Sequence, residues 1–140
     1  MFEGRCHCGA LTIELVTTSA PGELPVRICG CSFCALHRPR YTSAPAGHVT
    51  IHAADAAHLL RYRFGLRLAD FLICGTCGVF VAAYVPGDPA RAVLNLCVLA
   101  RAAELVAEPT HFTAYDAEDA VTRTARRARA WTPASLVVGP

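Results

Sequence analysis

The chain has 140 residues, of which 54% are hydrophobic and 17% charged, and its formal net charge is +2. These values are typical of one globular domain with its own core, here residues 1–140. They exclude a disordered chain and the strongly basic face that nucleic-acid binding requires. All 13 basic residues are arginines, which excludes a Schiff-base lysine or a phosphate-loop lysine. The bias toward Ala and Arg suggests a GC-rich, bacterial coding sequence.

Two segments of the sequence are informative about the cellular compartment of the protein. The N-terminal stretch MFEGRCHCG contains an acidic residue and no apolar core, so we do not expect a secretory signal. The longest uncharged run, Phe71–Val85, is shorter than the roughly 20 residues of a membrane-spanning helix, and it is interrupted by glycines and cysteines. We expect it to be buried sheet. The predicted compartment is the reducing cytoplasm, where cysteine clusters bind metal more often than they form disulfides.

Most of the predicted elements are strands. Alternating hydrophobicity indicates half-buried strands in three segments: Ala10–Val16, His48–His52 and Leu59–Gly65. In the third of these, the apolar face is formed by Leu60, Tyr62 and Phe64. Two more apolar runs are expected to be more fully buried strands: Gly78–Gly87 and Ala92–Ala100.

Helix is expected in only two places. Ala53–Arg61 is predicted to begin as a short helical turn. Asp116–Ala130 is the better candidate, with Asp116 as N-cap, acidic residues in the first turn and arginines toward the end. The arginines at 123, 126, 127 and 129 are interpreted as a solvated helix face, because no aromatic residue is interleaved with them. The predicted fold class is mainly β with little helix.

Seven of the eight cysteines occur in three tight clusters: CHC at Cys6–Cys8, CGCSFC at Cys29–Cys34 and CGTC at Cys74–Cys77. A disulfide framework is one explanation of an even count. It is disfavoured because no export signal is present and a C-x-C pair cannot easily bridge itself. A redox pair at CGTC is a second explanation, but a strand rather than a helix is predicted to follow it. Zinc is the third and preferred explanation, since four thiolates close a tetrahedron around Zn²⁺.

Seven sulfurs do not make two complete tetrahedra. The simplest partition joins Cys6 and Cys8 to Cys74 and Cys77 as a structural zinc site. Cys29, Cys31 and Cys34 then hold a second zinc with one open position, as in catalytic sites, although spacing alone allows other pairings of the half-sites.

Five further residues complete this hypothesis. Gly9 and Gly78, each following the last cysteine of its pair, permit the left-handed backbone that points amides back at sulfur. His37 is an alternative fourth ligand of the second site, whereas His7 is expected to point away from the metal. Cys97 is interpreted as a small core residue.

Four segments together resemble the glutathione-dependent formaldehyde-activating enzyme family, which includes the centromere protein V type domain. They are GRCHCGALTIEL from Gly4, CGCSFC from Cys29, FLICGTCG from Phe71 and LNLCVLA from Leu94. The resemblance covers about residues 2–100, and LLRYRFG is similar to the strand before the family's last cysteine pair. Residues 101–140 are a C-terminal extension of the same domain.

The resemblance implies a β-tent of stacked antiparallel sheets, shared with a chaperone of small GTPases. It also implies the partition given above, with a structural zinc on Cys6, Cys8, Cys74 and Cys77 and a catalytic zinc on Cys29, Cys31 and Cys34. The implied activity is that of a carbon–sulfur lyase, which joins a thiol such as glutathione to formaldehyde or another small aldehyde.

The implied partners are therefore a small-molecule thiol and an aldehyde, with no nucleic acid and no membrane. Arg38 and Arg40 are candidates to meet the carboxylates of glutathione, although a solvated basic loop is preferred for them. The alternative function is a non-catalytic, zinc-stabilised module that binds a partner protein.

Overall fold

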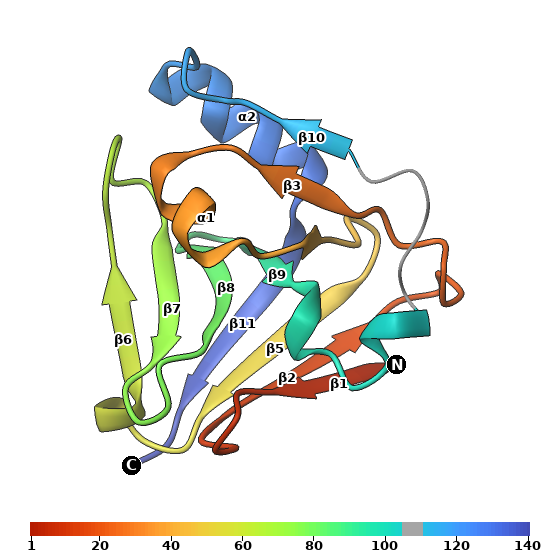
Figure 1. Cartoon of the computed structure of the whole chain (residues 1–140), viewed down its shortest axis with the longest axis vertical. Coiled ribbons are helices and arrows are strands. Elements are labelled where there is room, and N and C mark those ends of the chain that lie inside the picture. Colours follow the sequence, from red (N-terminus) through yellow and green to blue (C-terminus); the bar gives the residue numbers. More distant parts are fainter. Residues whose placement is uncertain (105–110) are drawn as a thin grey trace.

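The computed structural model describes residues 1–104 and 111–140 and contains mostly strands, which confirms the predicted fold class (Figure 1). The strands are β1 Phe2–Arg5, β2 Leu11–Val16, β3 Arg27–Cys29, β4 Tyr41–Thr42, β5 His48–Ala53, β6 Leu59–Tyr62, β7 Asp70–Cys74, β8 Phe80–Val85, β9 Ala90–Asn95, β10 His111–Thr113 and β11 Thr132–Val138. The helices are α1 Ser32–His37 and α2 Ala120–Ala130, with 3₁₀ turns η1 Ala56–His58, η2 Leu96–Val98 and η3 Ala102–Glu104.

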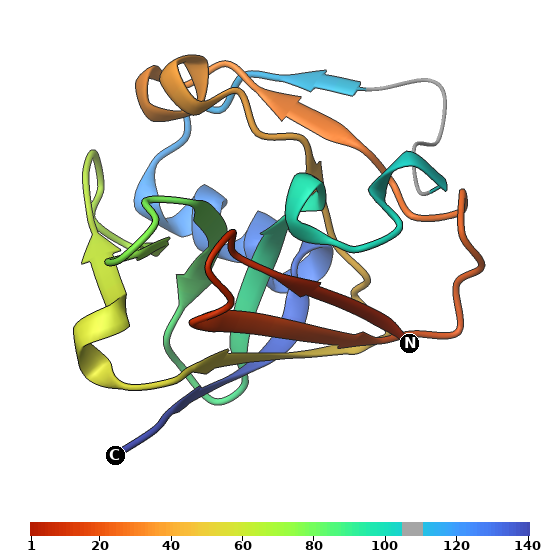
Figure 2. The same cartoon turned by 60° about the horizontal axis from the view of Figure 1, so that its bottom comes forward.

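The strands are hydrogen-bonded into one branched, mixed sheet. The main path runs β1-β2-β5-β11-β9-β4-β3-β10, and β9 also pairs with β8, which continues to β7 and β6. Most pairs are antiparallel, but β11 pairs with β5 and β10 pairs with β3 in parallel. Figure 2 shows β1 and β2 running side by side along β5. The C-terminal strand β11 therefore lies inside the sheet between β5 and β9, and the sheet branches at β9, which pairs with β11, β4 and β8.

Alternation on β2 and β5 builds the larger part of the core. On β2, Leu11, Ile13 and Leu15 are completely buried, whereas Glu14 and Val16 on the other face are exposed. Burying such side chains contributes about 1.5–3 kcal/mol each relative to leaving them in water. The alternation that predicted these strands is thus the direct cause of their orientation.

A second, aromatic core lies beside α1. Phe33 contacts Phe71 and Phe80 with ring centroids 4.7 and 5.1 Å apart, edge to face in both cases. Trp131, at the end of α2, belongs to the same cluster, as does Tyr41. Aromatic pairs of this geometry are worth about 0.5–1.5 kcal/mol beyond their burial. The short helix α1 is consequently packed against the sheet through its two buried side chains, Phe33 and Cys34.

Three predictions about single elements are corrected. The main helix begins after Asp119, whose carboxylate accepts from the Thr122 amide at 2.8 Å, so Asp116 is not its N-cap. Cys97 is exposed on the 3₁₀ turn η2 because β9 ends at Asn95, and it is not a core residue. Strand β6 ends at Tyr62, and Leu60 and Tyr62 are 53% and 50% exposed. The short helical turn expected within Ala53–Arg61 is confirmed as η1.

Among the residues described, the longest helix has 11 residues, and none is long and apolar enough to cross a membrane.

Candidate metal centres

Two groups of cysteines meet in the structure, and each could hold a metal ion. The four-cysteine cluster consists of Cys6, Cys8, Cys74 and Cys77, and the three-cysteine cluster consists of Cys29, Cys31 and Cys34. Within each cluster the sulfur atoms all lie within 4.8 Å of one another. All eight cysteines carry free thiols. The structure therefore groups the half-sites as the simplest partition of the sequence did.

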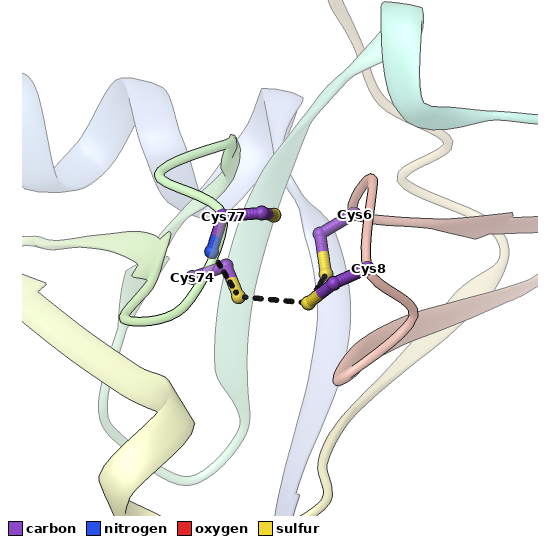
Figure 3. A group of neighbouring side chains, drawn as sticks. All are labelled: Cys6, Cys8, Cys74 and Cys77. Carbon is purple, nitrogen blue, oxygen red and sulfur yellow. Dashed lines mark hydrogen bonds between the residues drawn. The ribbon is translucent and has the colours of Figure 1, made fainter.

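The four-cysteine cluster joins two hairpins that do not pair with each other. Cys6 and Cys8 lie in the turn between β1 and β2, while Cys74 ends β7 and Cys77 lies in the turn before β8 (Figure 3). In the order of the sheet, β5, β11, β9 and β8 separate β2 from β7. An ion bound here would cross-link the β1–β2 end of the sheet to the branch formed by β8, β7 and β6.

The sulfur separations suit a tetrahedral ion. The Sγ atoms of Cys6 and Cys8 are 3.7 Å apart, and those of Cys8 and Cys74 are 3.6 Å apart. A tetrahedron with metal–sulfur bonds of ~2.3 Å has edges of about 3.8 Å. Four soft thiolate donors at this spacing fit Zn²⁺ better than a hard cation, which prefers oxygen ligands.

Backbone amides in both turns point at the sulfurs. The Leu11 amide donates to Cys6 Sγ at 3.3 Å, and the Thr76 amide donates to Cys74 Sγ at 3.4 Å. Gly9 and Gly78 adopt φ of +86° and +79°, as predicted, because these turns need a left-handed residue after the second cysteine. Such hydrogen bonds favour the thiolate, which is the form that binds metal.

The four thiols ionise unequally. The backbone amide of Cys8, followed by that of Val79, lowers the pKa of Cys77 to about 6. The Ala10 amide acts in the same direction on Cys8, but desolvation and the hydrogen bonds with the neighbouring thiols raise the pKa of Cys8 to about 11. Adjacent thiolates repel one another, so a divalent cation is the group that would let all four ionise together.

The three-cysteine cluster is built where β3 turns into α1. Cys29 ends β3, Cys31 is the N-cap of α1, and Cys34 lies buried in the first turn of the helix. Cys31 Sγ accepts the Cys34 amide at 3.4 Å, which places both sulfurs on one side of the turn. The hydrogen bond with the Cys34 thiol lowers the pKa of Cys29 to about 6, and the same bond raises the pKa of Cys34.

Tyr41 supports this cluster from strand β4. Its hydroxyl lies 2.9 Å from Cys34 Sγ, and the residue is 6% exposed. Tyr41 was not predicted from the sequence, because its role depends on the pairing of Tyr41 with Arg27 across β4 and β3. No fourth Cys, His, Asp or Glu joins this cluster among residues 1–104 and 111–140. His37 is exposed and stacks on Phe33 at 4.3 Å between ring centroids, and the exposed His7 does not join the other cluster.

A cavity of about 370 Å³ opens beside the three-cysteine cluster. All three cysteines line it, together with Tyr41, the loop after β6 and the inner side of α2. Its size lies within the ~300–1,000 Å³ range of small-molecule sites. The three-cysteine cluster is therefore both incomplete as a tetrahedron and adjacent to a space that a ligand can enter.

The arginines of α2 form one wall of this cavity, which corrects the sequence interpretation. Arg123, Arg126 and Arg127 line the cavity, and only Arg129 of the four lies on the exposed face outside it. Their spacing of three and four residues places them on one helix face, and that signal was available in the sequence. By contrast, neither Arg38 nor Arg40 lines the cavity.

Comparisons with known proteins support the fold. No protein-family model and no curated protein matches the chain. A crystal structure of a Rhodobacter sphaeroides protein, a structural genomics target, superposes with a TM-score of 0.57 and 28% sequence identity. The match covers 79% of this chain and 99% of that one. The fold is thus shared with a solved bacterial protein.

Proposed function

We propose that the chain is a zinc-dependent enzyme of carbon–sulfur chemistry, which adds a thiol such as glutathione to formaldehyde or another small aldehyde. The observation that carries the proposal is the contrast between a complete four-cysteine cluster and a three-cysteine cluster that faces a cavity. Structural zinc sites are closed, whereas catalytic sites keep one position open. The resemblance of the cysteine motifs to the formaldehyde-activating enzyme family supports the same assignment.

Zinc at this site would stabilise the thiolate form of a bound thiol near neutral pH. In the reaction the sulfur attacks the carbonyl carbon, a C–S bond forms and the C=O π bond breaks. The thiol proton ends on the new hydroxyl group, so no oxidant or reductant is needed. Since this addition also occurs unaided, the contribution of the protein is to bring the two reactants together in the right orientation.

The side chains around the cavity serve that role. Cys29, Cys31 and Cys34 would hold the metal, and the Tyr41 hydroxyl fixes the orientation of Cys34 Sγ. Phe64 and Phe71 line the cavity, and their apolar rings would limit the access of water to the reacting atoms. Exclusion of water strengthens electrostatic interactions within such a site.

The substitution Cys31→Ser tests the proposal. The wild-type protein, purified without chelator, should contain two zinc ions per chain by elemental analysis, and the variant should contain one. Thiol binding and the rate of hydroxymethyl exchange above the uncatalysed rate, followed by NMR, should both be lost in the variant. Cys97→Ser is the matched control because Cys97 is exposed and outside both clusters. The proposal would be refuted if thiol binding and the rate of hydroxymethyl exchange were unchanged in Cys31→Ser.

The second candidate is a non-catalytic, metal-stabilised module that binds a partner protein. It is favoured by exposed apolar side chains on α1 and β6, namely Leu36 at 85%, Leu60 at 53% and Tyr62 at 50% exposure. Exposed apolar surface of this kind marks binding faces when it is contiguous. This alternative predicts that the second metal is absent or has four protein ligands. Zinc-edge X-ray absorption, which counts sulfur neighbours, distinguishes the two candidates.

A further inference from the structure

Positive charge is concentrated in the cavity beside the three-cysteine cluster. Five arginines and two carboxylates line it: Arg27, Arg67, Arg123, Arg126, Arg127, Asp116 and Glu118. Glu118 is held by two of these arginines, with its carboxylate 2.9 Å from Arg126 Nε and 3.4 Å from Arg123 Nε. The charge of Glu118 is therefore already neutralised within the wall, and Asp116 lies exposed at the rim.

Arg27 and Arg127 have no acidic partner within salt-bridge distance among the residues that the structure describes. Arg27 donates from Nη2 to Ser43 Oγ at 2.7 Å, and Ser43 in turn donates to the Ala130 carbonyl at 2.7 Å. Arg127 stacks over the Trp131 ring, with Cζ 4.5 Å from the ring centroid. Both guanidinium groups are thus held in place by neutral neighbours.

Arg127 is the more unusual of the two. Its Nε is buried and makes no hydrogen bond within the described structure. Desolvation, followed by the charges of Arg126 and Arg123, lowers the pKa of Arg127 to about 10. A guanidinium group that is desolvated next to like charges is destabilised in its charged form unless an anion approaches it.

The position of Arg27 links this charge to the metal ligands. Arg27 and Cys29 are separated by one residue on β3, so their side chains leave the same face of the strand. Both side chains line the cavity, and so does Arg127. A small molecule with one end at the three-cysteine cluster would therefore share one cavity with the guanidinium groups of Arg27 on β3 and Arg127 on α2.

We propose that Arg27 and Arg127 form an anion subsite, which receives a carboxylate of the molecule bound at the three-cysteine cluster. The ligand of this centre is then a thiol that carries a carboxylate rather than an uncharged thiol. Arginine suits this role because its planar fork of donors matches a carboxylate. The inference rests on the proposed function, and it adds the chemical class of the ligand and the two residues that select it.

Two thiols with the same three-carbon chain, one ending in a carboxylate and one in a neutral hydroxyl group, provide the test. Protein loaded with Co²⁺ is titrated with 3-mercaptopropionate and with 3-mercapto-1-propanol, and binding is followed by the sulfur-to-cobalt absorption bands. We expect the carboxylate thiol to bind about 10- to 100-fold more tightly, as hydrogen bonds to a charged group predict. Equal affinity of the two probes would overturn the proposal.

Variants assign the difference to the two arginines. Arg127→Gln should reduce the affinity for 3-mercaptopropionate to that for the neutral thiol and leave the neutral thiol unchanged. Arg129→Gln is the matched control, because Arg129 is an exposed arginine of the same helix that does not line the cavity. If Arg127→Gln does not fold by circular dichroism, Arg27→Gln takes its place. Equal weakening of both probes in a folded variant would contradict the subsite.

A third probe separates the failure of this inference from the failure of the proposed function. If neither thiol changes the cobalt spectrum, the proposed function fails. Glutarate, which has no sulfur, is then titrated into the zinc-loaded protein by calorimetry. Binding to the wild type and to Arg129→Gln, but not to Arg127→Gln, would still support the anion subsite. Absence of binding to the wild type would overturn it.

Discussion

The two cysteine clusters use similar local turns, yet their surroundings differ. The four-cysteine cluster draws its sulfurs from two hairpins on separate branches of the sheet, and backbone amides approach them in both turns. The three-cysteine cluster lies within six residues of chain and faces a cavity lined by arginines and aromatic rings. In both clusters the short spacing between cysteines brings sulfur atoms together. The four-cysteine cluster is complete because two chain segments supply its ligands, whereas the three-cysteine cluster draws on one segment only.

The largest expected effect comes from breaking the four-cysteine cluster. Structural zinc contributes ~10–16 kcal/mol of apparent binding free energy in small domains. This is comparable to the whole ~5–15 kcal/mol by which native proteins are stable. Cys74→Ser should therefore abolish cooperative thermal unfolding, measured by circular dichroism.

Cys29→Ser is the matched control for that variant, since it makes the same chemical change in the three-cysteine cluster. It should keep a cooperative transition while losing one metal ion per chain. Equal loss of cooperative folding in both variants would show that the clusters do not differ in structural role.

A smaller effect is expected from Tyr41→Phe. This change removes the hydroxyl 2.9 Å from Cys34 Sγ and leaves the aromatic ring in the core. Groups that hydrogen-bond to metal ligands typically contribute 10–100-fold to metal affinity. We expect a loss of about 10-fold or more in affinity for the second metal only. Competition with a chromogenic chelator measures it, with Tyr62→Phe as control because that ring is half exposed. A similar loss for both metals would count against a local role of Tyr41.

The smallest effect concerns the arginine wall of the cavity. Arg126, followed by Arg123, lowers the pKa of Glu118 from 4.5. A carboxyl whose pKa is lower in the folded state stabilises the protein above its unfolded pKa, and this contribution is lost as the pH falls through the folded value. Near neutral pH, Glu118→Gln should reduce the free energy of unfolding by about 1 kcal/mol or less, seen as a lower melting temperature. The difference from the wild type should vanish in acid.

Glu104→Gln is the control for this prediction, because Glu104 and its partner Arg101 are 57% and 56% exposed. That variant should change the melting temperature less at every pH. A difference for Glu118→Gln that grew as the pH fell would reverse the expected sign and refute the assignment.

Local patterns accounted for the predicted strands where one face is buried. On β2, Leu11, Ile13 and Leu15 alternate with polar or exposed residues, and the structure buries these three side chains. The same rule failed on β6, an edge strand paired only with β7, where Leu60 and Tyr62 are 53% and 50% exposed. Alternation predicts a strand, but it does not say whether another layer covers the apolar face.

The cysteine-bearing turns were determined by the sequence itself, because a C-x-C or C-x-x-C spacing with a following glycine specifies a turn of a few residues. Which turns meet, the cavity beside Cys29, and the inward face of Arg123, Arg126 and Arg127 were decided only by the tertiary structure. These features depend on contacts between residues far apart in the chain, such as the parallel pairing of β11 with β5. Local spacing contains no information about such contacts, so the chemistry of the cavity became visible only in the folded chain.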